Sequence, residues 1–131
     1  MDSATRTLVR QTAGDCCEYC RRHQRESPLA TLQIEHIIPK KHGGSDEPAN
    51  LALACVDCNL GKSSNLTGID PATENATNPI QLFNPRTHVW ADHFERQGPL
   101  IVGKTDVGRT TICVLNMNTE DQVERRRQSR S

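Results

Sequence analysis

Two short cysteine motifs are the first residues that could do chemistry. Cys17 and Cys20 enclose two residues, and Cys55 and Cys58 repeat the same spacing. A C-x-x-C turn places two sulfurs about 3.5–4 Å apart, which is the edge of a tetrahedron built on Zn–S bonds of about 2.3 Å. Two facing turns would complete a closed shell of four thiolates. The spacing therefore predicts a structural zinc site with these four cysteines as its ligands.

Other uses of the cysteines remain open at this point. A redox motif needs only one such pair and a thioredoxin-like setting, and disulfides need an oxidising compartment. Cys16 directly precedes Cys17 and could replace it as a ligand. Cys113 is expected to be a small buried hydrophobic residue.

A carboxylate and an imidazole stand side by side between the cysteine pairs. Residues 31–38 are rich in β-branched and apolar side chains and predict a strand, which carries Glu35 and His36 near its end. Neighbouring side chains of a strand point to opposite faces, so one of the two should face the core. Alone, the pair would be a partly buried histidine and a surface glutamate. The flanking cysteines, together with Asn50 and Asn59, favour a functional interpretation.

These pieces resemble a known family when they are taken in order. Cys-x-x-Cys, Glu-His-Ile-x-Pro, Asn-Leu and Cys-x-x-Cys-Asn-x-x-Lys follow one another over about residues 16–63. Their order and spacing resemble the zinc-stapled branch of the HNH endonucleases. The resemblance implies an α+β fold with a ββα-metal (His-Me finger) core, a structural zinc held by the four cysteines and additional C-terminal helices. Residues 79–118 resemble a block that follows this core in some bacterial members, and it has no assigned chemistry.

The resemblance also implies roles for four residues. His36 matches the general base, Glu35 the acidic metal ligand before it, and Asn50 the residue that holds the loop so that the histidine is aimed correctly. Asn59 matches the second metal ligand, where the family name has a final histidine, so the chain is an HNN-type variant. Oxygen ligands suit Mg²⁺ or Mn²⁺ as the catalytic ion.

Basic residues near His36 are candidates for contacts to nucleic acid. Lys40, Lys41 and His42 lie in the loop after the strand, where they could bind backbone phosphates, although a solvated turn is an equal alternative. Lys62 is a weaker candidate of the same kind. The expected partner is a nucleic acid, with double-stranded DNA favoured and RNA left open. The 16 Lys and Arg balance the 16 Asp and Glu, and this zero net charge counts mildly against nucleic-acid binding.

The pattern of apolar and turn residues divides the chain into four segments. They are a lead-in with a short helix (1–15, helix about 6–11), the HNH core (16–64), a connector with an extension packing on the core (65–118), and a C-terminal helix with a basic tail (119–131). Within the core we expect a turn running into a helix at 17–24, strands at 31–38 and 51–54, and a helix at 57–64. In the extension we expect a helix capped by Asn84-Pro85 with Trp90 and Phe94 on one face, a strand at 101–105, a helix at 107–115, and a capping box at Thr119 and Gln122.

Composition limits the remaining possibilities. Leu, Ile, Val and Phe supply only 26 of the 131 residues, so the core is thin and a metal staple would help it to fold. No apolar run reaches the length of a membrane span, and the first residues lack the apolar stretch of a signal peptide, which makes the cytoplasm the expected location.

Three functions are compatible with these features. The first is a metal-dependent endonuclease. The second is a catalytically inactive, zinc-stabilised nucleic-acid-binding module, which the zero net charge and the Glu35–His36 pair disfavour. The third is a zinc-knuckle protein-interaction domain, which would need the cysteines alone and leaves the other residues unexplained.

Overall fold

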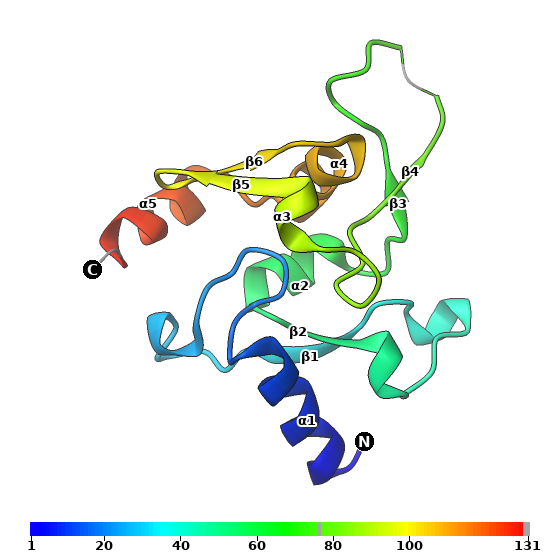
Figure 1. Ribbon diagram of the computed structural model, residues 1–131, viewed down its shortest axis with the longest axis vertical. Coiled ribbons are helices and arrows are strands. Elements are labelled where there is room, and N and C mark those ends of the chain that lie inside the picture. The colour runs from blue at the N-terminus through cyan, green and yellow to red at the C-terminus, as the bar shows by residue number, and fades with distance from the viewer. Residues whose placement is uncertain (76, 130–131) are drawn as a thin grey trace.

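A two-stranded hairpin followed by a helix forms the centre of the protein (Figure 1). The computed structural model describes residues 1–75 and 77–129. Strands β1 (Gln33–His36) and β2 (Leu51–Ala54) pair antiparallel, and helix α2 (Val56–Lys62) follows at once. All of β2 is buried, with α1 (Ser3–Ala13) packed against it. The predicted order of strand, loop, strand and helix is confirmed, with a shorter first strand than expected.

Helix ends follow the capping residues in the sequence. Asp2 accepts a hydrogen bond from the backbone N–H of Thr5, and Gly14 ends α1 in the left-handed conformation, so α1 is longer than predicted. Helix α2 is capped by Cys55, whose sulfur lies 3.4 Å from the backbone nitrogen of Cys58. A predicted metal ligand therefore also starts this helix.

The helix predicted at 17–24 is wrong. Arg21 has a φ of 70°, which a right-handed helix cannot include, and Cys16 forms an isolated antiparallel bridge with His23. A single 3₁₀ turn, η1 (Gln24–Glu26), follows with His23 as its cap. The segment closes back on itself through two backbone hydrogen bonds of 2.8 Å, in which Cys17 N–H donates to the Arg22 carbonyl oxygen and Gln24 N–H to that of Asp15.

The C-terminal half lies on the side of α2 away from α1 (Figure 1). Its elements are β3 (Thr67–Gly68), β4 (Ile80–Gln81), α3 (Trp90–His93), β5 (Phe94–Gln97), β6 (Leu100–Gly103), α4 (Asp106–Leu115) and α5 (Glu120–Gln128). Strands β3 and β4 form one antiparallel pair, and β5 and β6 form another. Helices α2 and α4 pack together at Gly61, where a Cβ atom would lie 2.7 Å from the carbonyl oxygen of Leu115.

Several predictions for this half need correction. No helix starts at Asn84-Pro85, because the following residues form a turn, and the short α3 begins only at Trp90. Phe94 is the first residue of β5, so the two aromatic residues do not share a helical face, although their ring centroids lie 5.1 Å apart. The helices predicted at 107–115 and after Thr119 are confirmed by α4 and α5.

The basic C-terminal segment is helical as far as Gln128. Arg126 is buried, and its guanidinium donates to the carbonyl oxygens of Met117 and Pro99 and to the side chain of Asn118. This part of the tail therefore stabilises the fold, while residues 130–131 lie outside the described part. Within that part, every helix is too short or too polar to cross a membrane.

Candidate functional site

The four predicted cysteine ligands form one buried cluster. The sulfurs of Cys17, Cys20, Cys55 and Cys58 all lie within 4.8 Å of one another. The Cys20 and Cys55 sulfurs are 3.7 Å apart, close to the edge of about 3.8 Å that Zn–S bonds of about 2.3 Å give a tetrahedron. Four soft sulfur donors at this spacing suit Zn²⁺ and leave no open position.

The remaining two cysteines take no part in the cluster. Cys16 lies outside it and is partly exposed, so the buried Cys17 is the ligand of that pair. Cys113 is exposed on α4, and its prediction as a buried residue is wrong.

Residues inside the first cysteine motif fasten the C-terminal half to the cluster. Glu18 is buried, accepts from the backbone N–H of Leu53 at 2.8 Å, and forms an ion pair with Arg86. The indole N–H of Trp90 donates to the carbonyl oxygen of Tyr19 at 2.7 Å. Residues 79–118 thus help to hold the Cys17–Cys20 turn in place, a role that their sequence did not indicate.

Glu35 faces the interior, as one member of the pair was expected to do. It is 5% exposed; the Tyr19 hydroxyl donates to Oε1, and the Lys62 ammonium lies 3.1 Å from Oε2. Burial raises the pKa of Glu35, while Lys62 and Tyr19 act in the opposite direction. Burial also raises the pKa of Tyr19 well above its usual value, which keeps its hydroxyl protonated as a donor. The carboxylate is therefore held from the inside by one hydroxyl and one ammonium.

Lys62 does not reach the surface, and its prediction as a nucleic-acid contact is wrong. The side chain is 2% exposed, and its Nζ also lies 3.2 and 3.0 Å from the carbonyl oxygens of His36 and Ile37. An ammonium with these partners is directed at Glu35 and at the end of β1. Its role is to fix the strand that carries both candidate residues.

His36 is more accessible than Glu35, with a side chain that is 24% exposed, and an unpredicted carboxylate holds its ring. Its Nε2 lies 2.6 Å from Oδ1 of Asp46, whose second oxygen lies 3.1 Å from the Lys40 ammonium. The hydrogen bond to His36 lowers the pKa of Asp46, and Lys40 adds to this effect. Sequence reasoning missed Asp46, although a carboxylate in the loop after Gly43-Gly44 was a signal that could have been followed.

Asn50 holds the loop between the two strands. Its side chain accepts from the backbone N–H of Ile38 at 2.8 Å and donates to the carbonyl oxygens of Ile38 and Ser45 at 3.0 and 2.8 Å. Gly44 makes the close fold possible, because a Cβ atom there would lie 1.7 Å from the Ile38 carbonyl oxygen. These contacts fix the segment that starts at His36 and returns Asp46 to it.

Glu35, His36, Asn59 and Lys40 line one open depression of about 290 Å³. The side-chain amide of Asn59 donates to Gln33 Oε1 at 2.6 Å, which leaves its carbonyl oxygen for another partner. Carboxylate and amide oxygens are donors of the kind that Mg²⁺ and Mn²⁺ bind, but the Glu35 carboxylate is 4% exposed and has internal partners, so the Asn59 oxygen is the accessible donor of the two.

The other two predicted phosphate contacts lie beside this depression. Lys41 and His42 are exposed in the 3₁₀ turn η2 (Lys40–His42), and they are not among the residues that line it.

A comparison with known families agrees with this arrangement. Residues 17–65 match a family model described as HNH endonuclease. The matched range holds the four clustered cysteines and every residue that lines the depression. No curated protein and no solved structure matches the chain.

Proposed function

We propose that the protein is a metal-dependent endonuclease that hydrolyses phosphodiester bonds of double-stranded DNA, which the match of residues 17–65 to the HNH endonuclease family model supports. His36 is the general base. The observation that carries the proposal is the shared depression, whose lining residues include His36, Glu35 and Asn59. We interpret β1, β2 and α2 as a ββα-metal arrangement, with a structural zinc on the four cysteines at its base.

The contact with Asp46 decides which ring nitrogen of His36 can act. An ionised carboxylate only accepts hydrogen bonds, so Nε2 carries the proton in the 2.6 Å contact. Nδ1 is then left with its lone pair and can take a proton from a water molecule. As that water attacks phosphorus, the ring becomes positively charged, and Asp46 stabilises this charge.

Residues of the same depression could also neutralise the negative charge of the phosphate. Glu35 and Asn59 would hold a divalent cation, Mg²⁺ or Mn²⁺, which supplies neutralisation of the phosphate and of the departing oxygen when it is bound. Tyr19 and Lys62 fix the Glu35 side chain in place for this role. Lys40 and its neighbours Lys41 and His42 would hold the strand by its phosphates.

A DNA-binding module without catalysis is the second candidate, and one observation favours it. Both oxygens of Glu35 already have internal partners, so a cation must compete with the Lys62 ammonium for that carboxylate. Such a module would bind DNA and leave it intact.

Nicking of supercoiled plasmid separates the two candidates. Zinc-loaded protein is tested without further metal, with Mg²⁺ and with Mn²⁺, so that the structural metal is retained throughout. We expect nicking that depends on the added ion and falls about 10²- to 10⁴-fold in His36→Ala. His23→Ala, a histidine outside the depression, is the control. A gel shift without nicking under any of these conditions would refute the nuclease and favour the second candidate.

A further inference from the structure

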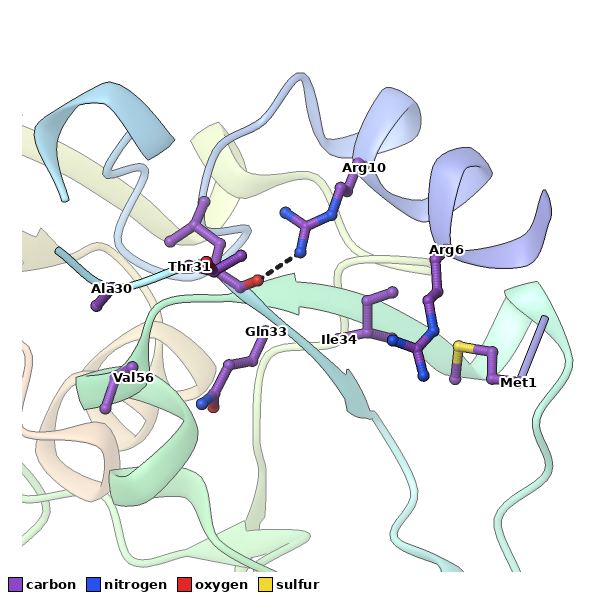
Figure 2. A pocket seen from close by; sticks show the side chains of 9 residues that line it. Met1, Arg6, Arg10, Ala30, Thr31, Gln33, Ile34 and Val56 are labelled. Atoms are coloured by element: carbon purple, nitrogen blue, oxygen red, sulfur yellow. Dashed lines mark hydrogen bonds between the residues drawn. The ribbon is translucent and has the colours of Figure 1, made fainter. Parts of the chain in front are cut away.

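A second hollow, larger than the one at His36, opens between α1 and the start of β1 (Figure 2). Its volume is about 560 Å³. The floor consists mainly of β1 and the residues before it, and α1 forms one wall. Its two arginines, Arg6 and Arg10, lie before the residues that match the HNH family model.

The charge of this hollow is positive. Arg6 and Arg10 supply its charged side chains, and no acidic residue is among those that line it. Figure 2 shows both arginines leaving α1 toward β1. Arg10 donates to the carbonyl oxygen of Leu32 at 2.7 Å, and Arg6 and Ile34 both line the hollow. Within residues 1–75 and 77–129, the Arg6 guanidinium has no ion pair or hydrogen bond, so all its donors are available to a ligand.

The two hollows adjoin along β1. Ile34 lines both of them, and Gln33 of the larger hollow holds Asn59 of the smaller one at 2.6 Å. At about 3.3 Å per residue, Ile34 lies about 7 Å and Leu32 about 13 Å from His36 along the strand. One DNA strand rises about 3.4 Å per nucleotide along the helix axis, so residues at these distances fall within about four nucleotides of the scissile bond.

We infer that the hollow between α1 and β1 binds the backbone of the DNA strand that is cut. Arg6 and Arg10 contact phosphates within about four nucleotides of the scissile bond. The inference rests on the proposed function for the identity of the ligand. Positive charge without acidic neighbours, an unpaired guanidinium and continuity with the depression at His36 together match a polyanionic strand rather than an apolar partner.

The test measures DNA binding separately from cleavage. Zinc-loaded His36→Ala protein is titrated into a fluorescent duplex of about 20 base pairs at several salt concentrations, with and without the additional change Arg6→Gln. One phosphate contact changes log K by about 0.9 per tenfold change in salt, so Arg6→Gln should reduce the salt slope by about 0.9. The factor by which this substitution weakens binding should therefore be about 8 times larger at about 0.1 M salt than at about 1 M salt. Arg127→Gln, an exposed arginine on α5, is the matched control and should change neither quantity.

The outcomes distinguish this inference from the proposed function. Equal affinity and equal salt slope for Arg6→Gln and Arg127→Gln would overturn the inference, as would a lack of DNA binding. Plasmid nicking by the unsubstituted protein together with that result would leave the nuclease standing. A reduced salt slope in Arg6→Gln, together with no plasmid nicking by the unsubstituted protein, would support the binding site and refute the nuclease. Arg6 is the residue tested first, because Arg10→Gln would also remove the hydrogen bond to Leu32.

Discussion

Replacing Lys62 by methionine is expected to destabilise the protein by about 3–5 kcal/mol, because it leaves a buried carboxylate without its counter-ion. The Lys62 side chain is 2% exposed and that of Glu35 is 4% exposed, with 3.1 Å between Nζ and Oε2. Methionine fills a similar volume, so the change removes charge more than packing. After the change, Glu35 keeps only the hydroxyl of Tyr19 as a partner.

Urea unfolding measures this effect. With a slope of about 2 kcal/mol per molar urea, the expected loss lowers the midpoint by about 1.5–2.5 M. The zinc-loaded protein is followed by far-ultraviolet circular dichroism at about pH 7, so that the metal site is the same in each sample. A domain of this size has about 5–15 kcal/mol of stability, and the variant should therefore still fold in buffer.

Lys40→Met is the matched control for Lys62→Met. The Lys40 side chain is 63% exposed and pairs with Asp46 in solvent, where an ion pair contributes about 0–1 kcal/mol. Equal midpoints for the two variants would refute the reasoning, because Lys62 would then contribute no more than an exposed lysine.

Three further changes test other parts of the structure. Cys55→Ser should lose its zinc and unfold, because binding of structural zinc supplies about 10–16 kcal/mol of folding free energy. The control variant Cys113→Ser should keep one zinc per chain, as measured by elemental analysis. A folded, metal-free Cys55→Ser protein would contradict the zinc site. Asp46→Asn should slow plasmid nicking at least about 10-fold and move the acid limb of its pH–rate profile to lower pH, since an amide stabilises a protonated imidazole less than a carboxylate does; an unchanged profile would exclude this role. Hydrogen bonds from Arg109 lower the pKa of Asp70 to about 2, so its carboxylate stabilises the fold above about pH 4 and loses this effect as the pH falls toward 2. Asp70→Asn should therefore lower Tm most at neutral pH and less below about pH 4 in calorimetry, and a difference that does not vary with pH would count against the ion pair.

The parts of the site that could be predicted depend on short stretches of sequence. A C-x-x-C turn fixes the separation of its two sulfurs locally, so two such turns already indicated the cluster that the four cysteines form. The alternation of side chains along a strand placed one member of the Glu35–His36 pair inside, which is confirmed. Asp2, Gly14 and Thr119 act as helix caps within a few residues of their partners.

The parts that could not be predicted depend on contacts between distant residues. Lys62 looked like a surface lysine because the sequence does not show that the last turn of α2 faces the end of β1. Arg86 reaches Glu18 across 68 residues, and no local pattern marks either as a partner. Of the β5–β6 hairpin, only a strand at 101–105 was predicted, which overlaps β6. Strand β5 was missed because the four-residue spacing of Trp90 and Phe94 suggested a helical face, whereas pairing with Leu100–Gly103 favours a strand.

Removing both charges of the buried pair should show why the protein keeps it. Replacing a buried ion pair as a whole is often neutral or stabilising, while removing one partner is costly. We therefore expect the free energy of unfolding of the double variant Glu35→Gln/Lys62→Met to lie within about 1 kcal/mol of that of the unsubstituted protein. The double-mutant cycle should give a coupling energy of at least about 2 kcal/mol between the two residues. Plasmid nicking by the same variant should fall at least about 10²-fold, because the carboxylate proposed to hold the cation is gone. A double variant as unstable as Lys62→Met alone would show that packing of the lysine, and not its charge, stabilises the interior; a stable double variant with full activity would show that Glu35 has no part in the reaction.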